Sequence, residues 1–562
     1  MQNTGFSLAS LSAANWAGSA LAAGSAYPDM ILFNAKVYTV DDAQPRAQAF
    51  AVKGERFVAV GSNDEIKAFA GSATKRIDCG GATVLPGFND AHLHADGQML
   101  LYEVQVGNPF EVEFVTIDSI IQKLRERAAK TPPGFWVTGY FYDDMKVKDG
   151  RLINRLDLDK VSREHPVCVR HRGGHTSFYN SKAFELAGIT KETPNPPGGE
   201  FFHDETGLSG RVAELANGVL TAVGQREKFS PAEQAERARA GAAYFSKALV
   251  QYGLTTVQQS TWDVADLLAL QQIRQLGQLK HRVSYEVADA LLEAMIANNV
   301  RSGFGDDWIR LGATTEYTAD GSFSERTARL KAPYPGITPP YLGIEVRPQE
   351  VLDAWVERVH RAGIRVNVHA NGDAAIDSAL KAYERAFKLV PVFNGRPKIT
   401  HCTIVNDDLI RRIKAIDAVP AAFNTYAYYN SDKFGFYGEE IMSRSLAFRS
   451  FLDAGIPAAA GSDFYPGPFS PMMGIQGIVT RKGWDGKTWG LNQRVTVAEA
   501  IRIHTLNGAY AAAEENNKGS ITPGKLADFV ILDQDPHEAD PDQLRKIPIQ
   551  RTFTGGTMVY EA

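Results

Sequence analysis

The stretch Pro86-Gly-Phe-Asn-Asp-Ala-His-Leu-His94 is the most informative part of this sequence. It continues an apolar segment and ends in two histidines separated by one residue. On a strand, residues i and i+2 project to the same face, so His92 and His94 can bind one metal ion together. Two unrelated histidines would give the same short pattern. Its place at the end of an apolar strand favours the metal site.

Eight segments share this form, a short apolar strand that ends in polar residues and is followed by a helical pattern. They are 84–94, 254–260, 282–287, 309–319, 364–370, 398–403, 418–426 and 457–463. Eight strands that alternate with helices predict an α/β fold of the (β/α)₈ TIM-barrel type.

The barrel is expected to span 86–518. About 160 residues separate its first two strands, far more than an ordinary loop, which predicts an inserted subdomain at about 95–250. Segments 29–85 and 519–562 both show short alternating apolar runs. They predict one composite β-sandwich domain built from both ends of the chain. Two unrelated β caps are the alternative.

Residues 1–28 carry no charged side chain and are rich in Ala, Ser and Gly. They resemble part of an export signal that lacks its basic start, and they also fit a poorly ordered leader or tail. The sequence therefore leaves a cytoplasmic and an exported (periplasmic) location open.

The composition excludes several classes of protein. The chain has 562 residues, 44% of them hydrophobic, and a net charge of −5, which is typical of a globular protein. This charge gives no reason to expect nucleic acid or a membrane as partner. Three scattered cysteines are too few for a disulfide framework or a thiolate zinc site.

Other predicted strand ends carry further candidate ligands, His369, His401 and Asp463. A lone histidine that closes a strand is usually structural. Four histidines and an aspartate at the carboxyl ends of strands predict a metal centre, because barrel enzymes build their sites at that face. The ligand types favour Zn²⁺ over Mn²⁺ or Fe²⁺.

With these strand-end residues and the longer segments around them, the chain resembles the amidohydrolase superfamily. Within it, the chain resembles amidohydrolase family 3, the branch that includes N-substituted formamide deformylase. The resemblance covers nearly the whole chain. The matching segments are PGFNDAHLHADG (86–97), RGGHTSFYNSKAFELAGIT (172–190), NPPGGE (195–200), DGSFSERTA (320–328), HANGDAAID (369–377), GSDF (461–464) and TLNGAYAAAEENNKGSITPGKLADFVILD (505–533).

The resemblance implies that His92 and His94 hold the more buried metal and that His369 and His401 hold a second one. It implies that Asp463 is both a ligand and the general base. A carboxylate beside a metal-activated water can take its proton and later deliver it to the leaving group.

One position departs from the family pattern. Relatives typically carry a lysine, carboxylated on its side-chain nitrogen, four residues before the DGS motif, where this chain has Glu316. Glutamate presents the same carboxylate on a shorter arm. Glu316 therefore bridges two metals, serves a single metal, or faces solvent or an arginine, and the sequence leaves one or two Zn²⁺ per chain open.

Residues outside the metal set are candidates for contact with substrate. The resemblance implies that His175, in the inserted segment, lies over the active site, where we count it as catalytic. A loop histidine satisfied by the backbone is the alternative. Tyr142 and Asp143 follow a strand-like segment of the insert, and Tyr426 and Tyr428 follow the seventh predicted barrel strand. We expect these four to bind substrate, with core packing as the alternative for each ring.

The sequence thus predicts a metal-dependent hydrolase that cleaves an amide, N-acyl or N-formyl C–N bond of a hydrophobic small molecule. An ester or carbamate hydrolase and a hydrolytic deaminase share the same centre and remain alternatives. A non-catalytic barrel of the same family is disfavoured because such proteins usually lose ligands. A homodimer is an expectation from fold analogy alone.

Overall fold

The computed structural model describes residues 27–95, 97–391 and 395–562. Nearly all of the predicted leader, 1–28, lies outside the described residues. Among the helices that the structure does describe, none combines the length and the apolar character that a membrane crossing requires.

The centre of the molecule is an α/β arrangement of parallel strands. One sheet has the order β17-β16-β15-β8 and the other the order β18-β19-β20-β21-β22, and every pairing within them is parallel. Their bounds are β8 Phe88–Leu93, β15 Leu254–Thr261, β16 Arg282–Val287, β17 Ile309–Thr314, β18 Tyr317–Thr318, β19 Asn367–Ala370, β20 Lys398–His401, β21 Val419–Phe423 and β22 Ala459–Gly461. Each of the eight segments expected to form strands overlaps at least one of these, which confirms the α/β class.

The two parallel sheets are separate ladders and do not form one closed barrel. Backbone hydrogen bonds nevertheless connect them on both sides. Thr314 N donates to Arg365 O (2.9 Å) at one edge, and Asp463 N donates to His92 O (2.8 Å) at the other. Because all strands run parallel, their carboxyl ends gather at one end of the assembly.

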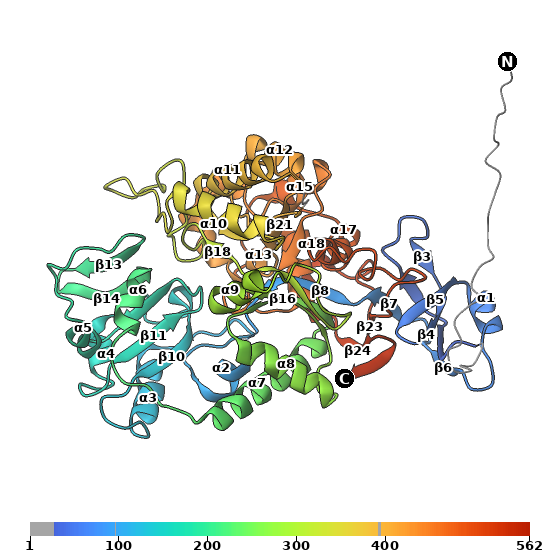
Figure 1. The fold of residues 1–562 in the computed structure, drawn as a ribbon, viewed down its shortest axis with the longest axis horizontal. Helices are drawn as coiled ribbons and strands as arrows, with labels where there is room; N and C mark the ends of the chain where they lie inside the picture. The colour runs from blue at the N-terminus through green and yellow to red at the C-terminus, as the bar shows by residue number, and fades with distance from the viewer. Residues whose placement is uncertain (1–26, 96, 392–394) are drawn as a thin grey trace, which may run out of the picture.

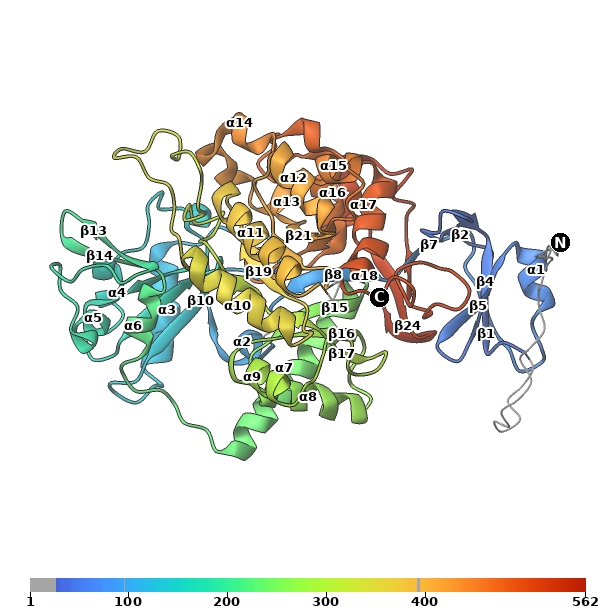
Figure 2. The ribbon, with the colours of Figure 1, turned by 45° about the horizontal axis from the view of Figure 1, so that its top comes forward.

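Helices alternate with these strands along the chain and cover their outer faces (Figure 2). They include α7 Pro231–Gln251, α8 Val264–Gln275, α9 Asp289–Ala297, α10 Gln349–Arg361, α11 Asp373–Leu389, α12 Asp407–Ala415, α15 Phe448–Asp453, α16 Pro471–Thr480, α17 Val497–Ile503 and α18 Leu506–Ala511. Their local sequences explain where they begin. In α7, for example, Ser230 and Glu233 form a capping box and Pro231 occupies the first turn, where its missing N–H costs nothing.

Most of the residues between β8 and α7 form a separate lobe with its own sheet, on the left in Figure 1. The sheet has the order β13-β14-β12-β11-β10-β9. Its strands are β9 Val104–Gln105, β10 Val137–Tyr142, β11 Val167–His171, β12 Thr176–Tyr179, β13 Gly199–Asp204 and β14 Gly207–Glu214. The helix α3 Ile117–Ala128 packs its buried face, including Ile120 and Leu124, into an apolar core under this sheet.

Both ends of the chain meet in one sheet at the opposite side of the molecule (Figure 1). Its order is β25-β24-β23-β7-β2-β3, in which β23 Phe529–Leu532 pairs antiparallel with β7 Thr83–Pro86. The rings of Phe50 and Phe529 pack at 4.9 Å, and those of Phe529 and Phe553 stack at 4.3 Å. The other strands are β2 Lys36–Tyr38, β3 Arg46–Ala47, β24 Ile549–Thr554 and β25 Thr557–Glu561, with β1 Met30–Phe33, β4 Ala49–Lys53, β5 Arg56–Gly61 and β6 Lys75–Asp78 in a neighbouring sheet.

Candidate metal centre and adjoining cavity

Six candidate ligands converge at the carboxyl ends of the parallel strands. His92 lies on β8 and His94 directly follows it, whereas Glu316 lies between β17 and β18. His369 lies on β19, His401 ends β20 and Asp463 lies two residues beyond β22. Parallel pairing brings these positions together, although His92 and Asp463 are 371 residues apart in the sequence.

Four of the six form one group of ligand atoms. His92 Nε2 lies 3.3 Å from Glu316 Oε1 and 3.3 Å from Asp463 Oδ1. His94 Nε2 lies 3.4 Å and 3.2 Å from the same two oxygens. Two imidazole nitrogens and two carboxylate oxygens therefore face a common point, which is a ligand set that suits Zn²⁺.

The second oxygen of Glu316 belongs to another group. Glu316 Oε2 lies 3.3 Å from His369 Nδ1 and 3.2 Å from His401 Nε2. The two imidazole nitrogens are themselves 2.9 Å apart. Glu316 thus directs one oxygen to each pair of histidines, as a carboxylate that bridges two metal ions does.

Electrostatics and hydrogen bonding both fit a metal site. Burial alone raises the pKa of the Glu316 carboxyl, but His92 and His401 beside it hold that pKa well below the usual range. Neither ring nitrogen of the buried His92 has a hydrogen-bond partner among the described residues. A buried polar atom without a partner is costly, and coordination to a metal would remove that cost.

The backbone at two of the ligands is strained. His401 has φ 72° and Asp463 has φ 50°, in the left-handed region that non-glycine residues rarely adopt. Hydrogen bonds from Asp463 N to His92 O and from Ser462 N to Asp90 Oδ1 (3.0 Å) hold the second of these turns. Strain of this kind concentrates at functional sites, where it aims side chains.

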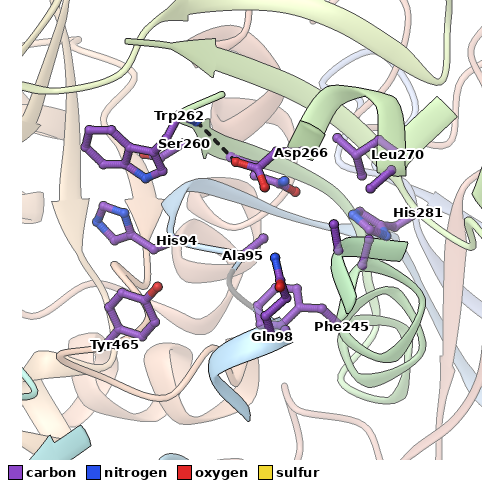
Figure 3. A pocket seen from close by; sticks show the side chains of 15 residues that line it. His94, Ala95, Gln98, Phe245, Ser260, Trp262, Asp266, Leu270, His281 and Tyr465 are labelled. Carbon is purple, nitrogen blue, oxygen red and sulfur yellow. Dashed lines mark hydrogen bonds between the residues drawn. The ribbon is translucent and has the colours of Figure 1, made fainter. Parts of the chain in front are cut away.

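Aromatic rings flank the imidazole of His94 (Figure 3). The ring of Trp262 lies nearly parallel to it at 6.5 Å between centroids, and that of Tyr465 does so at 5.5 Å on the other side. These three rings line one side of a side cavity of about 120 Å³, whose wall also includes Gln98, Phe245 and His281.

The metal centre opens into a larger cavity of about 490 Å³ between the parallel strands and the inserted lobe. His94, Glu316 and Asp463 line it from one side. The inserted lobe contributes Tyr140, Phe141, Arg170 and His175 among others. A cavity of this size accommodates a small organic substrate.

His175 lies in this cavity, next to the metal ligands. Its ring packs against that of His369 at 4.8 Å, and its Nδ1 lies 2.8 Å from Glu214 Oε2. Burial alone lowers the pKa of His175, but the Glu214 carboxylate raises it to about 10. The imidazole is therefore tied to a carboxylate and is more than a loop histidine satisfied by the backbone.

The four residues expected to bind substrate do not line the cavity. Tyr142 is buried in the core of the inserted lobe, where its hydroxyl accepts from Ile153 N (3.0 Å). Asp143 forms ion pairs of 2.9 Å with both Lys146 and Lys433.

The two tyrosines after β21 lie on the short helix α13 Tyr426–Tyr429. Tyr426 stacks on Phe423, which in turn stacks on His401, so Tyr426 supports a ligand from behind. Tyr428 points toward Arg545, whose guanidinium lies 5.1 Å from its ring. The chain turns into a helix at this point rather than an open loop, which explains both placements.

The sequence reasoning missed several residues that do line the cavity. Trp262 directly follows β15, and Tyr465 lies two residues after Asp463, so the strand-end rule applies to both. The third group of candidate ligands in the described residues, Asp143, Asp144 and His171, was not anticipated as a group. Its carboxylates are paired with Lys146, Lys433 and Arg326, which makes it an ion-pair network.

The parallel fold and the paired ligand groups define a metal-binding hydrolase, and the comparisons agree. Residues 75–560 match the amidohydrolase family, so the chain belongs to that family and is a hydrolase that acts on C–N bonds. This confirms the resemblance found in the sequence.

Two relatives extend over almost the whole chain. The putative amidohydrolase YtcJ of Bacillus subtilis is 28% identical over 542 residues, covering 93% of this chain and 98% of that protein. The N-substituted formamide deformylase of Arthrobacter pascens is 28% identical over 548 residues, covering 95% and 98%. A solved structure of an uncharacterized metal-dependent hydrolase from Pyrococcus horikoshii, 23% identical, shares the fold with a TM-score of 0.70 over 91% of this chain and 99% of that one.

Proposed function

We propose that this chain hydrolyses an amide, N-acyl or N-formyl bond of a hydrophobic small molecule at a two-metal centre. The observation that carries the proposal is the position of Glu316, whose two oxygens face two separate pairs of histidines. The relative named N-substituted formamide deformylase supports the C–N bond as the target.

The metal in this proposal is Zn²⁺; His92, His94, Asp463 and Glu316 would hold one ion, and Glu316, His369 and His401 would hold the other. Bound there, Zn²⁺ would supply a water of lowered pKa and polarise the carbonyl group.

Asp463 acts as the general base in this mechanism and then as the general acid. It takes a proton from the attacking water and delivers it to the amine nitrogen, which leaves as the C–N bond breaks. Its Oδ1 lies close to both His92 and His94, and its Oδ2 is 4.0 Å from His401 Nε2, so the carboxylate is central to the site. His175 contacts the substrate from the side of the inserted lobe.

The cavity supports a hydrophobic substrate. Met99, Phe141, Trp262 and Tyr465 line it next to the metal ligands. In this proposal the two parallel sheets work as one (β/α)₈ barrel (86–518), the inserted lobe covers its mouth, and the β domain (29–85 and 519–562) braces the far end. Small molecules are the partners, nucleic acid and membranes are not, and a homodimer is part of the proposal.

Metal content and activity of purified protein test this function. Elemental analysis of protein prepared without chelator should find about two zinc equivalents per chain. The protein should then cleave members of a panel of N-formyl and N-acyl amines, with esters, carbamates and amino-heterocycles as comparison substrates. Cleavage of esters alone would overturn the C–N assignment, and a protein that takes up no metal would favour the non-catalytic alternative.

A matched pair of variants tests the role of Asp463. Asp463→Asn should lower kcat by roughly 10²- to 10⁴-fold, the range typical of general acid–base groups, with the thermal midpoint little changed. Asp453→Asn, on an exposed side chain of α15, is the control and should behave like the parent. An unchanged rate in Asp463→Asn would remove this residue from the mechanism.

A further inference from the structure

The charged groups of the large cavity are unevenly paired. Its three carboxylates all have partners, since Glu316 and Asp463 face the histidines of the metal centre and Glu214 pairs with His175. The same cavity is lined by three guanidinium groups, those of Arg170, Arg172 and Arg347. None of the three forms an ion pair with a carboxylate in the part of the chain that the structure describes. The cavity therefore has an excess of positive charge outside the metal centre.

Arg172 has a structural role. Its guanidinium is buried and donates to the backbone carbonyls of Tyr465 (2.8 Å), Asn108 (3.2 Å) and Pro109 (3.3 Å), and to the hydroxyl of Tyr429. These bonds use its N–H groups to connect the inserted lobe to the loop after Asp463. Arg172 is a structural residue by this account.

Arg347 is held in place, and in the described part of the chain only one of its guanidinium nitrogens donates a hydrogen bond. Its guanidinium lies 3.9 Å from the ring centroid of Tyr317, which itself stacks on Trp355 at 4.1 Å. One terminal nitrogen donates to the carbonyl of Thr318, two residues after the bridging Glu316. A cation fixed this way is preorganised for a ligand next to the metal centre, because little side-chain entropy remains to be lost on binding.

Arg170 lines the same cavity from the inserted lobe. It lies on β11, where its cross-strand neighbour is Ser177 on β12, and both residues line the cavity together with Tyr140 of β10. Its guanidinium is 5.9 Å from the ring centroid of Tyr140. Arg170 is solvent-exposed, so its donors are available to a molecule that enters the cavity.

We propose that Arg170 and Arg347 bind an anionic group, in the first place a carboxylate, on the part of the substrate that does not react. The substrate class is then an N-acyl or N-formyl amine that carries a carboxylate beside an apolar group. The inference rests on the proposed function, since it names the substrate of that same site. The planar guanidinium suits a carboxylate because it offers parallel N–H donors.

The test compares two substrates that differ only in charge, racemic N-formylphenylalanine and its primary amide. The zinc-loaded parent enzyme should have the lower KM for the acid, and this preference should weaken as salt is added. In Arg170→Gln and in Arg347→Gln, KM for the acid should rise roughly 10- to 100-fold with kcat little changed, because a contact made equally in ground and transition states is lost. KM for the amide should stay within about twofold in both variants.

Two controls separate charge recognition from structural damage. Arg163→Gln removes an exposed arginine of the same lobe that does not line the cavity, and it should leave both substrates unaffected. Arg170→Lys and Arg347→Lys should recover part of the affinity for the acid. Equilibrium binding of N-acetylphenylalanine and its amide, followed by calorimetry, gives the same comparison without turnover.

The outcomes distinguish this inference from the proposed function. Equal KM values for the acid and the amide in the parent, or an equal rise in KM for both substrates in the variants, would overturn the anion site. The proposed C–N hydrolysis would still stand. Selective binding of the acid without any C–N cleavage by the zinc-loaded protein would overturn the proposed function and keep the anion site. A rise in KM that is confined to the acid, in either arginine variant, supports the inference.

Discussion

His175 Nδ1 lies 2.8 Å from Glu214 Oε2, and the backbone joins the same two residues, since Glu214 N donates to His175 O (2.8 Å). His175 directly precedes β12 of the inserted lobe, and Glu214 ends β14, the strand that pairs with β12. Glu214 adopts φ 53°, and its second oxygen accepts from Thr327 Oγ1 (3.0 Å). The lobe thus positions one imidazole against His369 of the metal centre through a carboxylate that is itself held in place.

The first prediction concerns this pair. Glu214→Gln should lower kcat by roughly 10- to 100-fold with zinc content unchanged, because the imidazole loses the carboxylate that orients it. His175→Asn should have a similar effect, and the double variant should be little worse than either single variant. Steady-state kinetics and elemental analysis check this. Glu205→Gln, an exposed change in the same lobe, is the control, and additive losses in the double variant would show that the residues act separately.

The second prediction concerns the bridging carboxylate. Glu316→Gln keeps the shape of the side chain but removes the charge that both histidine pairs face, so zinc content should fall from about two equivalents to one or fewer. Activity should fall with it. Elemental analysis after dialysis against metal-free buffer measures the loss. Glu345→Gln, on an exposed side chain of the following loop, should retain the parent's content. Two equivalents retained in Glu316→Gln would contradict a bridging role.

The third prediction concerns a buried ion pair beneath the metal centre. Lys398 Nζ contacts Glu286 Oε1 and donates to Ala91 O (2.8 Å), and Glu286 Oε2 lies 3.6 Å from His92 Nδ1. Both partners are fully buried. Removing one partner leaves an uncompensated buried charge, so Glu286→Gln and Lys398→Met should each destabilise the fold by about 3–5 kcal/mol.

The double variant Glu286→Gln with Lys398→Met is the matched comparison. It should be more stable than Lys398→Met or Glu286→Gln alone, because no unpaired charge remains. Urea denaturation of the three proteins measures the free energies of unfolding. A double variant that loses the sum of the two single effects would mean that the pair contributes no coupling.

The ligand positions were predictable because parallel strands impose them. A residue at the carboxyl end of any such strand faces the same end of the assembly, so His369, His401 and Asp463 could be placed together without knowing the packing between them. Glu316 was harder, since it lies just outside β17, and only its distance from the DGS motif marked it. Only the structure shows that its two carboxylate oxygens face two different pairs of histidines.

The substrate-facing residues of the inserted lobe were not predictable for a local reason. Alternation along β10 would place Tyr140 and Tyr142 on one face. Phe141 adopts φ 66°, and the pairing of β10 with β11 shifts register there. This bulge directs Tyr140 and Phe141 to the cavity and Tyr142 into the core. No feature of the sequence around Phe141 predicts the extra residue of this bulge.

The last prediction concerns the pH dependence of stability, through His281. This imidazole is buried beside the side cavity, its Nδ1 bonds to Ser246 Oγ (2.9 Å), and Nε2 has no partner among the described residues. Burial lowers the pKa of His281 to about 3, against about 6.5 in an unfolded chain. The unfolded state therefore takes up a proton below pH 6.5 while the folded state does not. Stability from this residue is fully present above pH 6.5 and is lost progressively as the pH falls toward 3, by about 2 kcal/mol between pH 6.5 and 5.

His281→Asn keeps a group that can bond Ser246 but cannot titrate, so its free energy of unfolding should fall less than the parent's over that range. Urea denaturation of both proteins at each pH measures the difference, from which effects shared by the two, such as loss of metal, cancel. The exposed His203→Asn should follow the parent, and parallel pH curves for His281→Asn and the parent would show that His281 does not titrate differently in the two states.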